Sequence, residues 1–483
     1  MDFGVTRETF GALSPLLVLV GGGILVLLAG AFASLSSRAL AALTLVVQGG
    51  AVISVLFYAP RFYGDYLRGA FLLDPYGCFG ALLRLAVAAA TTVLSVRTVE
   101  DLSMKAEYFS LLLFAAAGGT AMLWTRDLLI IFLGLETLTI ASFILAGYFR
   151  ADRASTEGSL KFFLNGAFAA ALLLYGIALL FGATGSTRIP EIAKLLPAAQ
   201  SPQWLLLWLG GTFVVVGLLF KMAVVPFHAW SPDVYQGAPT PVAGFLSVGS
   251  KAAAALVLLR FLTETFPEGD RWHTPLWILA VATMLYGNLC AIPQMQLKRM
   301  LAYSSIAHAG YLLVGILALG ELTREAVLVY TVAYGFMNLG AFAAVLAFER
   351  VQPGGIRDAS LENLRGAGYR APFLGAVLAL FMFSLAGIPP TVGFVAKYYL
   401  FAAALKEGFV GLVVLAVVAT AVSLYFYLRV VVYLYMHEPE GGEEAPSLAP
   451  GLAVTLGVCA LGTLAFGVFP SRLLEWAAWA VWG

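Results

Sequence analysis

Long apolar stretches separated by short polar connections run through the whole of this sequence. A helix needs about 20 predominantly apolar residues to cross the hydrocarbon core of a bilayer. About fourteen stretches reach that length, and we place them at residues 13–33, 38–58, 76–96, 106–124, 127–148, 158–183, 203–226, 239–266, 272–292, 299–319, 324–349, 371–404, 408–436 and 449–470. The pattern predicts an all-α fold, a polytopic membrane helical bundle whose first helix is retained rather than cleaved as a signal peptide.

Composition supports lipid as the solvent of this chain. It is 61% hydrophobic and 11% charged, whereas an average soluble domain has about 25% charged residues. The net charge of +1 gives no reason to expect a nucleic-acid partner. Cys78, Cys290 and Cys459 lie far apart without C-x-x-C spacing, so we expect no metal cluster and no disulfide framework. Lysines and arginines divide almost evenly between the loops of the two sides, so the positive-inside rule leaves the orientation open.

Prolines interrupt two of the predicted helices. Pro226 follows Lys221 in the seventh stretch, and Pro390 precedes Lys397 in the twelfth. A proline inside a helix removes a hydrogen bond, and in hydrocarbon the freed backbone is tolerated only beside protein or water. If stretches four to eight and nine to thirteen form two units, both interruptions fall in the fourth helix of five. Matching interruptions are typical of transporters built from repeats, although two unrelated proline kinks remain the simpler alternative.

An odd number of helices per unit would invert the second repeat relative to the first. We therefore predict two inverted five-helix repeats with two broken helices, flanked by further helices at both ends. The predicted divisions are three N-terminal transmembrane helices in 1–105, the first antiporter-like repeat in 106–266, the inverted second repeat in 272–436, and an acidic loop with the last helix in 437–483.

Four ionisable residues lie near the middle of apolar stretches, namely Glu136, Lys221, Lys251 and Lys397. A charge at the bilayer centre costs at least about 2.5–3.5 kcal/mol, so such residues are rare unless they act on ions or protons. Any one of them alone could be a structural ion pair. One carboxylate and three amines at similar depth, with His308 close to the same level, favour a function, because one glutamate cannot neutralise three lysines.

The residue types suit proton transfer. Burial away from water disfavours the charged form of an amine, and a nearby carboxylate favours it again. Moving Glu136 relative to Lys221 would therefore load or unload the lysine. The proton would continue through water and hydroxyl groups to Lys251, and past His308 to Lys397. His228, at the first interruption, could serve too or could simply form a hydrogen bond at a helix end, and Lys298 with Arg299 is interpreted as marking a helix start at the inner surface.

The stretch KMAVVPFHAWSPDVYQGAPTPVAGFLSVGSKAAAA, which begins at Lys221 and includes Lys251, resembles the signature of the antiporter-like subunits of respiratory complex I, the subunit N type in particular. The stretches LGLETLTIASFILAGY, QLKRMLAYSSIAHAGYLLVG and AGIPPTVGFVAKYYLF resemble the same family around Glu136, His308 and Lys397. The resemblance covers essentially the whole chain.

This resemblance implies a proton-translocating membrane subunit of NADH–quinone oxidoreductase, coupled to quinone reduction elsewhere in the complex. It implies no redox centre on this chain, with FMN, iron–sulfur clusters and quinone held by partner subunits. The implied partners are subunits M and K, with L, A, J and H in the same membrane arm, and the lipid bilayer. The implied location is the cell inner membrane, with both termini periplasmic. The implied roles are pairing of Glu136 with Lys221, connection by Lys251, and proton carriage by Lys397.

Two alternatives stay open from the sequence. One is a subunit of a multi-subunit Na⁺/H⁺ antiporter, which has the same architecture, although the sequence around Asp233–Val242 favours complex I. The other is a scaffold in which the buried charges only lock helices together.

Overall fold

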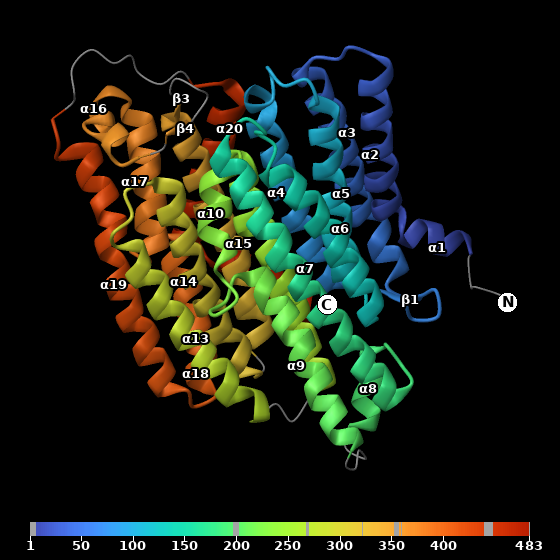
Figure 1. Cartoon of the computed structure of the whole chain (residues 1–483). Coiled ribbons are helices and arrows are strands. Elements are labelled where there is room, and N and C mark those ends of the chain that lie inside the picture. The colour runs from blue at the N-terminus through green and yellow to red at the C-terminus, as the bar shows by residue number, and fades with distance from the viewer. Residues whose placement is uncertain are drawn as a thin grey trace.

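The computed structural model describes residues 6–196, 202–266, 270–320, 322–351, 357–358, 360–438 and 448–482. Within these residues it is an almost entirely helical bundle (Figure 1). The long apolar helices are α2 (Ser14–Phe32), α3 (Ser37–Ile53), α4 (Pro75–Thr98), α5 (Lys105–Leu123), α6 (Leu128–Ala146), α7 (Arg153–Thr184), α9 (Gln203–Met222), α13 (Asp270–Ala291), α14 (Leu297–Ala318), α15 (Thr323–Phe348), α19 (Val410–Tyr435) and α20 (Pro450–Val468). One further span joins α11 (Thr240–Phe245), the π turn η3 (Leu246–Ser250) and α12 (Lys251–Thr265).

The described residues contain thirteen helices long and apolar enough to cross a membrane. The fourteenth predicted stretch is the broken pair α17 (Pro372–Ala386) and α18 (Val392–Lys406). The predicted polytopic, all-α membrane bundle with two interrupted helices is therefore confirmed.

Short elements complete the described chain. Apart from the π turn Ser54–Tyr58, which lies inside the predicted stretch 38–58, the search for long apolar stretches did not predict them. These are α1 (Arg7–Ala12), η1 (Ser54–Tyr58), η2 (Ala59–Phe62), the paired strands β1 (Gly64–Tyr66) and β2 (Phe71–Leu73), α8 (Ile189–Leu195), α10 (Trp230–Gly237), the paired strands β3 (Arg350–Val351) and β4 (Arg357–Asp358), η4 (Glu362–Leu364), α16 (Ala367–Arg370) and α21 (Ser471–Trp482). Most of the acidic stretch predicted as a loop, residues 439–447, lies outside the described residues.

The two interruptions have the same backbone design. After α9, Ala223 adopts a left-handed conformation with φ 59°, and the amide of Val224 donates to the carbonyl of Leu219 at 3.1 Å. After α17, Gly387 is left-handed with φ 86°, and the amide of Ile388 donates to the carbonyl of Phe383 at 3.0 Å. Such a cap pairs backbone groups that a helix end would otherwise leave exposed to hydrocarbon.

A second correspondence concerns where α6 and α14 begin. Asp127, directly before α6, forms an antiparallel bridge with Arg188, and Gln296, directly before α14, forms one with Ser360. Each bridge therefore joins the start of one helix to the chain that follows the next helix. In Figure 1, α8 lies at the lower end of the bundle, whereas α16, β3 and β4 lie at the upper end.

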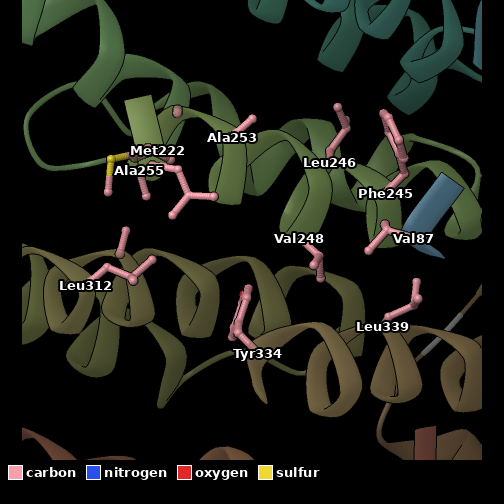
Figure 2. Close-up of a cluster of buried hydrophobic side chains, with 14 of the residues drawn as sticks. Val87, Met222, Phe245, Leu246, Val248, Ala253, Ala255, Leu312, Tyr334 and Leu339 are labelled. Atoms are coloured by element: carbon pink, nitrogen blue, oxygen red, sulfur yellow. The ribbon is translucent and has the colours of Figure 1, made fainter. Parts of the chain in front are cut away.

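The span α11–η3–α12 lies at the centre of the bundle, and the most apolar part of it is wholly buried. Figure 2 shows its contact with α15, where Val248 and Tyr334 project toward each other among apolar side chains that include Leu339. By contrast, α2 and α20 bury only about a third of their most apolar stretch inside the chain. Their exposed apolar faces are suited to lipid, and the central span is suited to hold polar groups away from it.

Candidate functional site: buried lysines at the two helix breaks

The first polar cluster joins α6 to the end of α9. Lys221 is the last residue but one of α9 and is 1% exposed. Its Nζ donates a hydrogen bond to Oγ1 of Thr139 at 2.8 Å, and it lies 5.1 Å from the centroid of the Phe162 ring. Thr139 stands almost one turn after Glu136 on the same helix, so α6 presents a hydroxyl and a carboxylate to one amine.

Glu136 and Lys221 share a cavity but make no direct ion pair within 4.0 Å among the contacts of the described residues. The Oε1 atom of Glu136 is buried and has no hydrogen-bond partner. A cavity of about 10 Å³ is lined by Glu136, Thr139 and Lys221, and about this volume holds one water molecule. The site therefore has the polar atoms and the room for a water that bridges the carboxylate and the amine.

Lys251 is the first residue after the π turn and is 2% exposed. Its Nζ donates to the carbonyl oxygen of Ser305 at 2.7 Å and to its Oγ at 2.5 Å. The ring of Tyr235 lies 6.0 Å from this amine. The hydroxyls of Tyr235 and of Ser250, the residue before Lys251, are buried without hydrogen-bond partners. Among the described residues no carboxylate lies within ion-pair distance of Lys251.

A second group of hydrogen bonds begins at the neighbouring residue of α14 and leads to His308. Ser304 adjoins Ser305, and its Oγ lies 2.5 Å from the hydroxyl of Tyr427. That hydroxyl lies 3.2 Å from Nε2 of His308, whose Nδ1 lies 2.6 Å from the hydroxyl of Tyr330. A histidine held between two hydroxyls can accept a proton at one nitrogen and release one at the other.

Lys397, on α18, lies beyond the second interruption and is 4% exposed. Its Nζ donates to the carbonyls of Leu385 and Ala386 at 3.0 and 3.2 Å. These carbonyls belong to the last turn of α17, which carries the negative end of that helix dipole. The ring of Tyr311 lies 4.8 Å from the amine and packs edge-on against His308, with centroids 5.6 Å apart. Ring contacts, rather than hydrogen bonds, thus join His308 to Lys397.

The comparisons with known proteins agree on one family. The family model described as "NADH:quinone oxidoreductase/Mrp antiporter, TM" matches residues 125–423, which is more than half of the chain. The NADH-quinone oxidoreductase subunit N 1 of Solibacter usitatus is 40% identical, over 98% of this chain and 96% of that relative. The chain belongs to the subunit N family of NADH–quinone oxidoreductases.

Solved structures share the fold of this subunit N family member. A chain of the respiratory complex I from Thermus thermophilus with bound aureothin is 34% identical, with a TM-score of 0.81 over 95% of this chain and 98% of that one. A chain of the Mrp complex from Dietzia sp. has a TM-score of 0.85 over 99% and 97% of the two chains, but it is only 23% identical. The second likeness shows the fold alone and does not favour the Na⁺/H⁺ antiporter alternative.

For this subunit N family member, the structure brings together some predicted site residues and not others. Glu136 and Lys221 line one cavity, and the hydrogen bonds of Lys251 and of His308 lead to the adjacent residues Ser305 and Ser304. No hydrogen bond between described residues joins these two clusters directly. His228 lies apart in the loop between α9 and α10, half-buried, with its ring edge-on to Tyr286 at 4.3 Å.

One buried charge was not selected from the sequence. Arg84 of α4 is 1% exposed and donates to the carbonyls of Gly249 at 2.6 Å and Ala115 at 2.8 Å. Gly119 leaves room for it, because a Cβ there would lie 2.0 Å from the guanidinium carbon. No carboxylate of the described residues pairs with Arg84, so a full positive charge lies beside the π turn that precedes Lys251.

From the sequence, Lys298 is interpreted as a residue at the membrane surface, but in the structure its side chain is buried. It does lie in the first turn of α14, but it is 4% exposed and forms an ion pair with Glu349 at 3.2 Å. Its neighbour Arg299 pairs with Asp233 at 2.6 Å. Both partners are far away in the sequence, so no local pattern marks either pair.

Proposed function

We propose that this chain moves protons across a membrane as a subunit of NADH–quinone oxidoreductase, driven by quinone reduction in partner subunits. The observation that carries the proposal is that two hydrogen-bonded groups meet at adjacent residues of α14. Lys251 donates to Ser305, and Ser304 is linked through the hydroxyl of Tyr427 to His308. A scaffold needs paired charges, whereas this chain presents a nearly unexposed amine with only neutral partners. Membership of the subunit N family supports the proposal.

Glu136 and Lys221 would form the loading step. A water in their shared cavity would pass a proton between carboxylate and amine without a direct ion pair. A small movement of α6 against α9 changes their separation, and Coulomb energy in a low-dielectric site changes steeply with separation. Partner subunits could therefore set the charge of Lys221 by moving one helix.

Lys251 would receive the proton next. The unpaired hydroxyls of Tyr235 and Ser250 supply positions at which waters can bind beside Lys251. From Lys251 the proton would follow the hydroxyls of α14 to His308, and reach Lys397 past Tyr311.

Arg84 would act on Lys221 without itself transferring a proton. Its guanidinium stays protonated at neutral pH and donates to the carbonyl of Gly249, two residues before Lys251. It also interacts electrostatically with Lys221. Because like charges repel strongly in a buried site, this fixed cation would oppose the arrival of a proton at Lys221.

The two-repeat division predicted from the sequence remains a proposal. The matching caps after α9 and α17, and the matching bridges at Asp127 and Gln296, support inverted units over 106–266 and 272–436. Fourteen crossings would place both termini on the same side, which we assign to the periplasmic side of the cell inner membrane. We propose subunits M and K as direct neighbours, L, A, J and H as members of the same arm, and FMN, clusters and quinone as ligands of partner subunits.

The proposal is tested by replacing Lys251 in the complete complex, reconstituted into vesicles. Lys251→Ala is expected to lower proton pumping at least about tenfold, because the chain loses its proton carrier. Lys194→Ala, at an exposed lysine of α8, is the matched control and should pump normally. An assembled Lys251→Ala complex with full pumping and full NADH–quinone turnover would show that the lysine is structural. Proton movement that follows a sodium gradient, independent of quinone, would support the antiporter alternative.

A further inference from the structure

A buried arginine holds the backbone just before Lys251. Arg84 lies nine residues after Pro75, the first residue of α4, and therefore roughly 14 Å into this helix. Its guanidinium joins two other helical segments, because one Nη atom donates to the carbonyl of Gly249 at 2.6 Å and the other to that of Ala115 at 2.8 Å. A charge at this depth is costly, and membrane proteins retain one where it has a function.

The carbonyl of Gly249 belongs to the π turn that precedes Lys251. Gly249 lies inside η3, and Lys251 is the first residue after it. A π turn contains one residue more than an α-helical turn, so the residues after it are rotated by roughly 100° from their places in an unbroken α-helix. The direction in which Lys251 points therefore depends on this turn, and the arginine donates to a carbonyl within it.

Gly119 on α5 provides the space that the guanidinium occupies. A Cβ at Gly119 would lie 2.0 Å from Cζ, 2.2 Å from Nη2 and 2.4 Å from Nε of Arg84. Gly119 follows Ala115 by one turn of the same helix, so one face of α5 supplies both a hydrogen-bond acceptor and the room for the donor. Any side chain at Gly119 would displace the guanidinium while leaving its charge in the protein.

The chain on both sides of the π turn is held by other contacts. Asn338 of α15 donates to Oγ of Ser247 at 2.7 Å, at the start of the turn. The hydroxyl of Tyr76 donates to the carbonyl of Leu256 at 3.0 Å, five residues after Lys251. Because these two contacts anchor the span, loss of the arginine's hydrogen bonds would change the turn between them without releasing the whole helix.

We propose that Arg84 is a positioning residue, which directs Lys251 toward Ser305 by holding the π turn. The amine then reaches both the carbonyl oxygen and Oγ of Ser305, at 2.7 and 2.5 Å. This role differs from a charge effect on Lys221, because it depends on where the guanidinium lies. Its consequence for transport rests on the proposed proton transfer through Lys251, whereas its geometry does not.

The test uses Gly119→Ala in the complete complex, reconstituted into vesicles. This variant keeps the arginine and its charge but fills the space of the guanidinium, so we expect proton pumping to fall about three- to tenfold. Gly49→Ala is the matched control in α3, because a Cβ at Gly49 would have nothing within 4 Å. In an Arg84→Met background, Gly119→Ala should cause no further loss, since the group that it displaces is gone. Additive losses would overturn the inference.

A second variant separates position from charge. Arg84→Lys keeps a positive charge but replaces the planar fork by a shorter, single ammonium group, which does not bridge the carbonyls of two helices as the guanidinium does. Pumping should therefore fall as it does in Gly119→Ala. If Arg84 acted through its charge alone, both variants would pump like the Gly49→Ala control, and the inference would be overturned unless the amine of Lys251 is displaced.

The position of the amine is measured directly in an experimental map of the Gly119→Ala complex. Nζ of Lys251 should lie beyond hydrogen-bond distance from Ser305, and an amine bound there as in the wild type would overturn the inference. An amine that is displaced while pumping stays normal would instead contradict the proposed function. If neither Gly119→Ala nor Arg84→Lys assembles, Arg84 serves folding rather than the direction of Lys251, and the inference is also overturned.

Discussion

The two helix interruptions share a backbone but differ in what holds their lysine. Lys221 precedes its break, donates to a threonine hydroxyl and shares a cavity with Glu136. Lys397 follows its break and donates to two carbonyls of the half-helix before it, with no carboxylate in ion-pair distance among the described residues. A carboxylate can approach or withdraw, whereas helix-end carbonyls are fixed. The first lysine is therefore suited to be switched, and the second to relay a proton at a constant environment.

The largest expected effect comes from removing either lysine. Lys221→Leu and Lys397→Leu should each lower proton pumping at least about tenfold, because neither site holds a second proton carrier. Pumping would be measured as proton uptake per NADH oxidised in vesicles, with Lys194→Leu as the exposed control. If only one of the two variants lost pumping, the two breaks would not belong to one route.

Neutralising Glu136 should impair the Lys221 site and leave the Lys397 site unchanged. Glu136→Gln keeps the shape but loses the charge, so we expect pumping to fall about three- to tenfold through the Lys221 site alone. Glu136→Asp should restore part of it, because the carboxylate remains. A proton uptake that is equal in wild type and Glu136→Gln would mean that the cavity between Glu136 and Lys221 has no part in loading.

The left-handed residues at the two breaks, Ala223 and Gly387, can each be replaced by the residue that the other break has. Gly387→Ala should destabilise by roughly 1–2 kcal/mol, since an L-residue is disfavoured at its φ of 86°. Its new Cβ would also lie 3.1 Å from Cδ of Lys397. At the first break, Ala223→Gly removes the cost of about 1 kcal/mol that an L-residue has in the left-handed conformation. It also loses the burial of one methyl group, which contributes about 0.8 kcal/mol. Thermal unfolding of the assembled complex should therefore shift down for Gly387→Ala and stay nearly unchanged for Ala223→Gly.

The smallest effect is expected at the hydroxyl that holds Lys221. Thr139→Val keeps the shape but removes a hydrogen bond worth about 1 kcal/mol. Turnover should fall by about two- to fivefold, and the variant should respond to Glu136→Gln less than the wild type does, because the amine is no longer anchored to α6. Additive losses in the double variant would argue that Thr139 and Glu136 act on separate groups.

Sequence patterns predicted the spans, both interruptions and the four central ionisable residues, because each of these features depends on the local pattern of apolar residues, prolines and charges. Contacts between residues far apart in the sequence could not be predicted from such patterns. Arg84 donates to a carbonyl 165 residues away, and the buried partner of Lys298 is Glu349, fifty-one residues later. The π turn before Lys251 contains no proline or charged residue from which it could have been predicted. The pattern of apolar residues indicates how deep a residue lies in the bilayer, but it does not indicate which polar side chains contact one another at that depth.

The most direct test is an experimental map of the assembled complex that resolves ordered waters. The account predicts a water within hydrogen-bond distance of both Oε1 of Glu136 and Nζ of Lys221, and further waters at the unpaired hydroxyls of Tyr235 and Ser250. A dry cavity at Glu136, with apolar side chains packed between Lys221 and Lys251, would contradict proton transfer along this route.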